Sequence, residues 1–326
     1  MALPISSDRT ILVTGGAGFI GSHLVDRLLP TGCRVVVIDN FNDFYNPEIK
    51  RSNISSHLEQ SNYRLFDIDI RNDLEIDEVF KSEPIDTVVH LAAMAGVRPS
   101  IADPVLYNEV NLLGTLNILE ACRSAEVPRL VFASSSSVYG NNEKIPFHED
   151  DPVDHPISPY ASTKKSGELM VHTYHHLFGI GAVCLRFFTV YGPRQRPEMA
   201  IHLFTDRIFR GEAVDMYGEG DSERDYTYID DIIDGIMACL EREFDYQVIN
   251  LGRSDTVKLS ELISMIEERL KKKAEINRLP MQPGDVNRTY ADINRARELL
   301  GFEPKVSISE GLDRFVAWYL DRQGAE

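Results

Sequence analysis

Short apolar runs alternate with longer segments of helical spacing through the first half of the chain. Five of these apolar runs are continuous rather than alternating, which is typical of strands that are buried on both faces of a sheet. They cover residues 11–14, 35–38, 63–67, 87–90 and 130–133. Because the segments between them have helical periodicity, we expect βαβ units that build a parallel sheet.

Capping residues and prolines mark where several helices begin and end. The first helix is predicted to open at Gly18 and to stop near Pro30. Asp103-Pro104 and Ser158-Pro159 each combine a capping side chain with a proline at the first helical position. We therefore expect further helices to begin at these two pairs.

The pattern loosens after about Phe187, where glycine- and proline-containing loops become frequent. Amphipathic helices are still predicted over residues 260–272 and 309–320. Ser307 and Glu310 fit a capping box at the start of the second of these helices.

The length of 326 residues suggests two domains. We expect residues 1–187 to form the parallel-sheet domain and residues 188–326 to form most of a smaller α/β domain, with an interleaved boundary. The 43% hydrophobic content is sufficient for a complete core. No apolar run approaches the roughly 18 residues that a membrane helix needs, so we expect no membrane span.

The charge balance is strongly acidic. Lys plus Arg number 34 and Asp plus Glu number 51, which gives a formal net charge of −17. A chain with this charge is poorly suited to bind nucleic acid or an anionic membrane. If the substrate is an anion, a local arginine cluster must overcome the overall field.

The four cysteines, at positions 33, 122, 184 and 239, are far apart and form no CxxC pair. This spacing argues against a zinc site and against a disulfide framework. We expect reduced thiols in a cytoplasmic protein and no bound metal.

A glycine-rich segment follows the first predicted strand and opens the first helix. It satisfies GxxGxxG through Gly15, Gly18 and Gly21, and GxGxxG when Gly16 replaces Gly15. Such glycines allow a tight turn and the close approach of a pyrophosphate to the helix N-terminus. A glycine turn that holds no ligand is the alternative interpretation.

Acidic and small residues follow the next strands at the edge where such sheets bind a dinucleotide. Asp39 ends the second strand, where a carboxylate holds the hydroxyls of the adenosine ribose. Because Asp39 would repel a 2′-phosphate, NAD is favoured over NADP. Asp69 follows the third strand, and Ala92 and Ala93 follow the fourth. The sequence therefore predicts a Rossmann-type, doubly wound parallel sheet that binds NAD.

Tyr160 and Lys164 form a YxxxK pattern, and a helix that begins at Ser158-Pro159 places them one turn apart on one face. A nearby ammonium and the positive nicotinamide both favour the phenolate. Moving tyrosine from a pKa near 10 to about 7 needs roughly 4 kcal/mol. A phenolate tuned in this way is a general base for an alcohol proton. Because YxxxK alone is common, an ordinary exposed tyrosine and lysine are the alternative.

Four serines, residues 134–137, follow the fifth predicted strand. Their hydroxyls could hydrogen-bond a substrate hydroxyl and share its proton, although a serine run alone is more often a turn. The order of glycine loop, acidic strand end, serine run and YxxxK is more specific than any one of them. This combination resembles the extended short-chain dehydrogenase/reductase superfamily and, within it, the nucleotide-sugar epimerases.

The resemblance extends from Ile11 to about Tyr319. Its matching segments are VTGGAGFIGSHL, HLAAMAGVRPS, NLLGTLNILEA, SSSSVYG, SPYASTKKSGELM, LRFFTVYGPRQRPEMA, RDYTYIDD and GDVNRTYADI. It implies a C-terminal substrate-binding domain and a homodimer whose core pairs helices near residues 104–122 and 159–176. It also implies a catalytic triad of Ser135, Tyr160 and Lys164.

The resemblance further implies two sets of contacting residues. The cofactor set is Gly15, Gly18, Phe19, Ile20, Gly21, Asp39, Asn40, Asn42, Asp69, Ile70, Leu91, Ala92, Ala93, Asn111, Tyr160, Lys164 and Phe187. The substrate set is Arg98, Ser135, Ser136, Thr189, Arg196, Met199, Ala200, Met216, Arg224, Gln282, Asp285 and Arg288. Within it, Arg224 matches the arginine that grips the UDP phosphates. Family members often carry a second arginine near position 282, so either Gln282 or Arg288 takes that part here.

Residues beside the serine run narrow the reaction. The 4,6-dehydratase branch carries Asp-Glu before its Val-Tyr-Gly, and the UDP-glucuronate decarboxylase branch carries Glu before the valine. This chain has Ser136-Ser137 there. Eliminating water needs an additional acid and base, so these branches are disfavoured. Segments 39–47 and 191–200 instead resemble the UDP-glucuronate 4-epimerases.

The second of these segments carries Arg194 and Arg196. A guanidinium suits a carboxylate, because two parallel charge-assisted hydrogen bonds can form. We expect Arg196 to hold the carboxylate of a uronate, with Thr189 and Ser136 as hydroxyl partners. Arg194 is the alternative, and a solvated basic loop is the interpretation without function.

The sequence thus favours NAD-dependent conversion of UDP-glucuronate to UDP-galacturonate through a 4-keto intermediate. A UDP-glucose 4-epimerase is the second interpretation, and a UDP-glucuronate decarboxylase is less favoured. The fold also hosts NAD-binding sensors without a reaction. Those sensors typically lose the YxxxK pattern, which this chain keeps.

Overall fold

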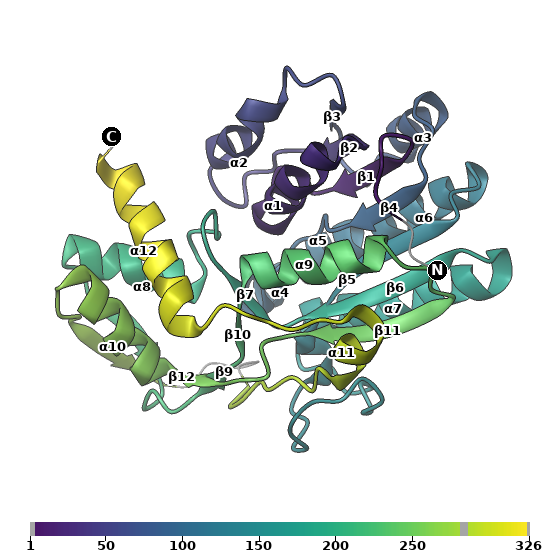
Figure 1. The fold of residues 1–326 in the computed structure, drawn as a ribbon. Coiled ribbons are helices and arrows are strands. Elements are labelled where there is room, and N and C mark those ends of the chain that lie inside the picture. The colour runs from purple at the N-terminus through teal and green to yellow at the C-terminus, as the bar shows by residue number, and fades with distance from the viewer. Residues whose placement is uncertain (1–3, 281–285, 325–326) are drawn as a thin grey trace.

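The computed structural model describes residues 4–280 and 286–324 (Figure 1). Within these residues, seven strands form a parallel central sheet in the order β11-β6-β5-β4-β1-β2-β3. They are β1 (Thr10–Thr14), β2 (Arg34–Asp39), β3 (Tyr63–Asp67), β4 (Thr87–His90), β5 (Arg129–Ser135), β6 (Gly181–Phe187) and β11 (Tyr246–Leu251). The five expected strands are present, and the strand order reverses between β1 and β4. This is the predicted doubly wound arrangement.

Alternate side chains of the central strands enter two separate cores. Ile11 and Val13 of β1 join a core with α1 (Phe19–Leu28) and α9 (Ile229–Leu240). Leu12 joins a core with α3 (Asp73–Ser82), α6 (Gly114–Ser124) and α7 (Pro159–Phe178). Because both faces of the sheet are covered by helices (Figure 1), the strands read as continuous apolar runs.

Two expected helix starts are confirmed by their caps. Ser158 Oγ accepts a hydrogen bond from the backbone N–H of Ala161 at 3.1 Å. Asp103 caps α5 (Pro104–Asn108), which continues through a π-helical turn into α6. The remaining helices are α2 (Pro47–Ile54), α4 (Val97–Ala102), α8 (Ala200–Arg210), α10 (Leu259–Leu270), α11 (Asn294–Leu300) and α12 (Ile308–Gly324).

Half of the expected capping box forms at α12. Ser307 Oγ accepts from the backbone N–H of Glu310 at 3.2 Å. The Glu310 carboxylate accepts from Arg314 at 2.6 Å and does not return to the cap. An ion pair along the helix therefore replaces the second half of the box.

The chain beyond residue 187 contributes to two parts of the molecule. β11 pairs with β6 in the central sheet, whereas α8, α10 and α12 form a separate group at one end (Figure 1). The domain boundary at residue 187 stays a prediction. Three small two-stranded sheets pair β7 (Thr189–Tyr191) with β10 (Tyr226–Tyr228), β9 (Glu223–Arg224) with β12 (Val257–Lys258), and β8 (Val214–Tyr217) with β13 (Ile276–Leu279).

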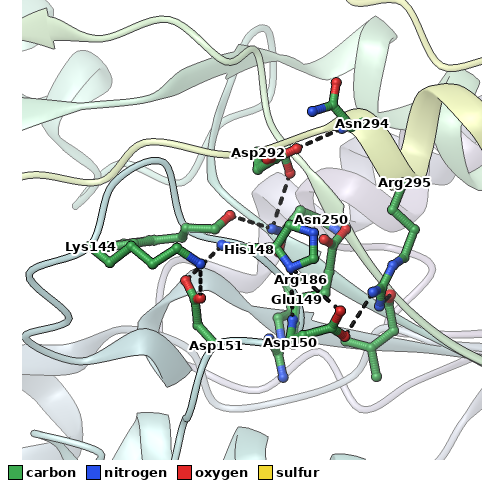
Figure 2. Close-up of polar contacts among 12 residues, drawn as sticks. Lys144, His148, Glu149, Asp150, Asp151, Arg186, Asn250, Asp292, Asn294 and Arg295 are labelled. Atoms are coloured by element: carbon green, nitrogen blue, oxygen red, sulfur yellow. Dashed lines mark hydrogen bonds and ion pairs between the residues drawn. The ribbon is translucent and has the colours of Figure 1, made fainter.

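Polar contacts hold the C-terminal segment against the sheet (Figure 2). Asn250 of β11 donates from Nδ2 to the carbonyls of Phe147 and Asp292, at 2.9 and 3.2 Å. Arg295 donates to Asp150 at 2.7 Å. The chain that follows residue 286 is thereby fixed beside the end of the sheet.

No helix among the described residues is long and apolar enough to cross a membrane. All four cysteines are buried and unpaired. Residues 4–280 and 286–324 contain no group of three or more His, Cys, Asp or Glu side chains placed to hold a metal ion.

Candidate active site

A cavity of about 760 Å³ runs along the carboxyl ends of the central strands. Gly15 follows β1, Asp39 ends β2, Ala92 follows β4 and Ser135 ends β5, and all four line it. Thr189 of β7 contributes to the lining from the second half of the chain. Ligands bind at this edge in doubly wound sheets. The cavity thus unites the expected cofactor and substrate residues in one space.

The turn between β1 and α1 depends on two glycines. Gly15 has a φ of +69°, and a Cβ there would lie 2.9 Å from the backbone nitrogen of Ala92. A Cβ at Gly21 would lie 2.1 Å from the carbonyl oxygen of Gly15. Phe19 and Ile20 line the cavity in the first turn of α1, where backbone N–H groups have no acceptor within the helix. This end of the helix suits a pyrophosphate.

The end of β2 is organised around the Asp39 carboxylate. Its two oxygens accept from the backbone N–H groups of Ala17 and Phe41, at 3.1 and 3.0 Å. Burial raises the pKa of Asp39, and the charge of Lys50 opposes this shift. Lys50 extends from α2 and donates to the carbonyl and the side chain of Asn42 at 3.0 and 2.8 Å. An ammonium therefore lies close to the predicted ribose site.

The structure brings the three expected catalytic residues together. Tyr160 and Lys164 line the cavity from the first turns of α7, and Ser135 lines it from the end of β5. Lys164 Nζ lies 5.9 Å from the centre of the Tyr160 ring and donates to the carbonyl of Ala133 at 2.7 Å. Ser135 lies close enough to Tyr160 to lower the pKa of its hydroxyl. This arrangement suits proton transfer at the Tyr160 hydroxyl.

Burial and charge act in opposite directions on Tyr160. Burial raises the pKa of Tyr160, while the nearby Ser135 hydroxyl and the charge of Arg196 lower it. Burial also lowers the pKa of Lys164 to about 8. We expect Lys164 and a nicotinamide together to lower the pKa of Tyr160. The polypeptide alone does not produce this lowering. A further positive charge in the cavity is needed to favour the phenolate.

A buried ion pair aligns β5 with α7. Arg186 of β6 donates from Nε and Nη2 to the two oxygens of Glu168 at 2.8 and 2.9 Å. Both side chains are only 2% exposed. Ser134 Oγ donates to the same carboxylate at 2.6 Å. Because Ser134 precedes Ser135, and Glu168 lies one turn after Lys164, the pair fixes the strand end relative to the catalytic helix.

The loop between β7 and α8 separates the two candidate arginines. Arg194, with a φ of +64°, donates to Asp26 of α1 at 2.7 Å, and it does not line the cavity. Arg196 lines the cavity and pairs through Nε with Glu198 Oε1 at 2.8 Å. Its guanidinium lies 5.6 Å from the centre of the Phe44 ring. Of the two, Arg196 is the one placed to meet a ligand.

The two arginines expected near a diphosphate differ in their placement. Arg224 lines the cavity and donates to the carbonyl of Glu223 at 2.9 Å. Arg288 does not line the cavity and instead pairs with the Glu223 carboxylate at 2.9 Å. The geometry therefore favours Arg224 over Arg288 as a ligand contact.

Asp225, next to Arg224, joins several segments around this end of the cavity. It is completely buried. Its oxygens accept hydrogen bonds from the backbone N–H groups of Arg253, Ser254 and Ala291 and from the hydroxyl of Thr227. Burial raises the pKa of Asp225 to about 6.

Most expected site residues line the cavity, and the exceptions have clear structural reasons. Every described member of the two expected sets lines it except Asn111, Met216 and Arg288. Asn111 is buried and holds both backbone polar groups of Met94. Met216 points into the core, because side chains alternate along β8. Gln282 and Asp285 lie outside the described residues. Individual contacts with a ligand stay predictions.

Several lining residues were not expected from the sequence. They are Phe44, Tyr45, Lys50, Glu198, Arg207 and Tyr217, among others. Arg207 follows Ala200 by about two turns of α8, so helical spacing from Ala200 would have identified it. Lys50 and Tyr45 depend on the path of the chain after β2, for which periodicity gives no signal.

Comparisons with known proteins agree with this architecture. The model of the GDP-mannose 4,6 dehydratase family matches residues 12–315. A UDP-glucuronate 4-epimerase of Thermodesulfobacterium geofontis is 43% identical over 308 residues, which cover 94% of this chain and 95% of that protein.

Solved structures of epimerases have the same fold. The UDP-glucuronic acid 4-epimerase of Bacillus cereus, in complex with UDP-glucuronic acid and NAD, has a TM-score of 0.91 and 40% identity, and the match covers 96% of this chain and 99% of that one. The UDP-glucose 4-epimerase of Thermotoga maritima, with UDP-glucose, has a TM-score of 0.88 and 34% identity, with 97% and 100% covered. The motifs, the fold and the match over nearly the whole length show that the chain belongs to the GDP-mannose 4,6 dehydratase family, and its relatives include UDP-glucuronate 4-epimerases.

Proposed function

We propose that the protein is an isomerase, a UDP-glucuronate 4-epimerase that interconverts UDP-glucuronate and UDP-galacturonate with NAD as its cofactor. The observation that carries this proposal is one cavity lined by Ser135, Tyr160, Lys164 and Arg196. The first three suit proton transfer at a sugar hydroxyl, and the guanidinium suits a sugar carboxylate. The similarity to UDP-glucuronate 4-epimerases over nearly the whole chain supports the same reaction.

The glycine turn and the end of β2 fit NAD. The N-terminus of α1 suits the pyrophosphate, and no larger residue fits at Gly15 or Gly21. Asp39 suits the adenosine ribose hydroxyls and disfavours a 2′-phosphate. Bound there, NAD would supply the acceptor and donor of the hydride that leaves C4 of the sugar and returns to the opposite face.

The protein's own groups handle the proton and hold the substrate. Tyr160 takes the proton of the C4 hydroxyl as general base and returns it when C4 is reduced. Ser135, which lines the cavity beside Tyr160, is the proposed second hydroxyl that shares that proton. The Lys164 ammonium, one turn away, favours the phenolate. Arg224 is the proposed anchor for the diphosphate, which stays fixed while the sugar turns over.

The carboxylate needs control because the oxidised uronate is a β-keto acid. Such acids lose carbon dioxide readily, since the resulting carbanion delocalises into the ketone. The site must keep the bond between the sugar ring and the carboxylate carbon C6 out of alignment with the π system of the C4 ketone. It must also keep the negative charge on the carboxylate. Arg196, Thr189 and Ser136 all line the cavity and are the proposed partners of the carboxylate. A guanidinium fits this task because it binds a localised carboxylate most strongly.

Product analysis with a panel of UDP-sugars tests the proposed reaction. The holoenzyme should convert UDP-glucuronate to UDP-galacturonate far better than it converts UDP-glucose, with products resolved by chromatography or NMR. If UDP-glucose is turned over as well as UDP-glucuronate, the assignment of a uronate substrate is wrong.

Arg196→His tests the role given to Arg196. The variant should bind UDP-glucuronate more weakly, epimerise it more slowly and release some UDP-4-keto-pentose. Arg297→His is the matched control, because Arg297 pairs with Glu303 and does not line the cavity. Unchanged turnover of UDP-glucuronate by Arg196→His would exclude Arg196 as the carboxylate partner.

We also propose a homodimer in the cytoplasm. Helices α5 to α7 carry exposed apolar side chains, with Val105 65% and Leu169 56% exposed. A second copy that packs on this face would bury them. The four buried, unpaired cysteines fit a reducing compartment.

A further inference from the structure

Arg196 already has a carboxylate partner within its own chain. Glu198 Oε1 lies 2.8 Å from Arg196 Nε, and the two side chains are 40% and 20% exposed. Both residues line the cavity. The backbone N–H of Met199 donates to the carbonyl of Arg196 at 3.1 Å, which turns the loop so that the two side chains share one space.

Contacts on both sides hold this loop in place. His23 of α1 hydrogen-bonds the carbonyl of Pro193 at 2.9 Å, and Arg194 pairs with Asp26 on the same helix. Gln195 donates to the carbonyl of Val190 at 3.1 Å. The positions of Arg196 and Glu198 are therefore set by an anchored backbone.

We propose that Glu198 is a built-in partner of Arg196 that sets how strongly the site discriminates UDP-glucuronate from neutral UDP-sugars. This inference rests on the proposed function. The Arg196–Glu198 pair is neutral overall. The carboxylate of a bound uronate would therefore lie beside an arginine whose charge is already balanced, and close to the carboxylate of Glu198. A neutral sugar, in contrast, leaves Arg196 paired.

The pair changes the energetics expected from the sequence. An isolated guanidinium in the cavity would penalise UDP-glucose heavily, because a buried charge without a partner is costly. Glu198 removes much of this penalty and weakens uronate binding through like-charge repulsion. It also leaves Arg196 with a partner when a uronate product dissociates. Glu198 therefore reduces the preference for UDP-glucuronate over UDP-glucose that Arg196 provides.

The test measures binding without turnover. NAD-loaded Tyr160→Phe protein is compared with Tyr160→Phe/Glu198→Gln by calorimetry, with UDP, UDP-glucose and UDP-glucuronate as ligands. Glu198→Gln should tighten UDP-glucuronate binding about fivefold, as expected for removal of one like charge at a partly exposed site. Binding of UDP should not change, because UDP lacks the hexose that would reach Arg196, and binding of UDP-glucose should stay equal or weaken.

Glu303→Gln in the same background is the matched control. Glu303 pairs with Arg297 at 3.4 Å, and neither residue lines the cavity. The substitution therefore removes a carboxylate from an Arg–Glu pair outside the site. All three dissociation constants should stay unchanged in this variant.

Kinetics of the enzyme with Tyr160 intact give the second readout. The ratio of kcat/KM for UDP-glucuronate to that for UDP-glucose should rise about fivefold in Glu198→Gln. An unchanged ratio overturns the role of Glu198. Weaker binding of UDP-glucuronate overturns it too, because Glu198 would then orient Arg196 for the substrate. If the wild-type holoenzyme does not convert UDP-glucuronate at all, the proposed function fails and this inference fails with it.

Discussion

At the scale of single residues, burial sets the chemistry of the cavity as much as residue type does. Tyr160 and Lys164 were expected from the order of motifs and from the resemblance to the nucleotide-sugar epimerases, but burial moves both toward their neutral forms. A positive cofactor in the same cavity would counteract this effect for Tyr160. If Tyr160 is the base, as we propose, the polypeptide supplies its position and a positive cofactor would contribute to its ionisation.

Tyr160→Phe should abolish turnover, because the phenyl ring keeps the packing and cannot carry a proton. Binding of NAD and UDP should persist, as measured by calorimetry. Tyr63→Phe is a suitable control, since the buried Tyr63 hydroxyl has no hydrogen-bond partner in the described part of the chain. Activity of Tyr160→Phe within tenfold of wild type would remove Tyr160 as the base.

Asp225 should make the stability of the fold depend on pH. Its folded pKa of about 6 lies above the unfolded value near 4, so its contribution is fully present below about pH 4 and is lost as the pH rises through 6. The loss amounts to about 3 kcal/mol. Urea unfolding of wild type and Asp225→Asn should therefore differ more at pH 4 than at pH 8. A difference that is independent of pH would contradict the raised pKa.

At the scale of elements, the geometry of the site depends on the contacts that hold α7 against β5 and β6. The helix carries Tyr160 and Lys164 in its first turns and Glu168 one turn later. Glu168 is bound to Arg186 of β6 and to Ser134 of β5. Any rotation or sliding of α7 would break these contacts, so the buried pair fixes the positions of Tyr160 and Lys164 relative to β5.

Arg186→Met should lower the free energy of unfolding by about 3–5 kcal/mol, because it removes the buried cation of Glu168 and leaves that carboxylate only the partly exposed Lys165, at 3.3 Å. The double variant Arg186→Met/Glu168→Gln should recover part of this loss, since it leaves no buried charge unpaired. Denaturant unfolding followed by circular dichroism measures both. A double variant no more stable than Arg186→Met would show that shape rather than charge compensation dominates.

At the scale of the whole molecule, the two halves of the chain close one cavity. The first half supplies the glycine turn and the proposed catalytic residues, and the second supplies Arg196, Arg207 and Arg224. These guanidinium groups are placed locally in a chain of net charge −17. Arg196 and Arg207 pair with Glu198 and Asp215, which also line the cavity, so an anionic ligand must compete with these carboxylates for the guanidinium groups.

Leu113→Glu/Leu169→Glu should convert the proposed dimer into a monomer. Both side chains are exposed on the α5–α7 face, at 46% and 56%, and a charge there cannot be buried against a second copy without a partner. Light scattering after size-exclusion chromatography should show the mass of one chain instead of two. Leu58→Glu, at a leucine 55% exposed near α2, is the control and should leave the mass unchanged. A wild-type protein with the mass of one chain would refute the dimer.

The sequence predicted the local parts of this architecture well. Continuous apolar runs identified β1 to β5, and capping pairs identified the starts of α5 and α7. β6 and β11 were not expected. They pair with each other across a long stretch of chain, and such a pairing leaves no local signal in the sequence. The glycine turn and the YxxxK spacing were predictable because each depends only on backbone geometry within a few residues.

By itself, the sequence determined the doubly wound sheet, the cofactor turn and the catalytic helix, since periodicity, capping and glycine conformation act over short distances. Only the tertiary structure decided that Arg196 faces the cavity while Arg194 binds Asp26, and that Arg288 pairs with Glu223. It alone added Lys50 and Glu198 to the site. The physical reason is that these side chains find partners far away in the sequence or across a loop, and such pairings depend on the path of the whole chain.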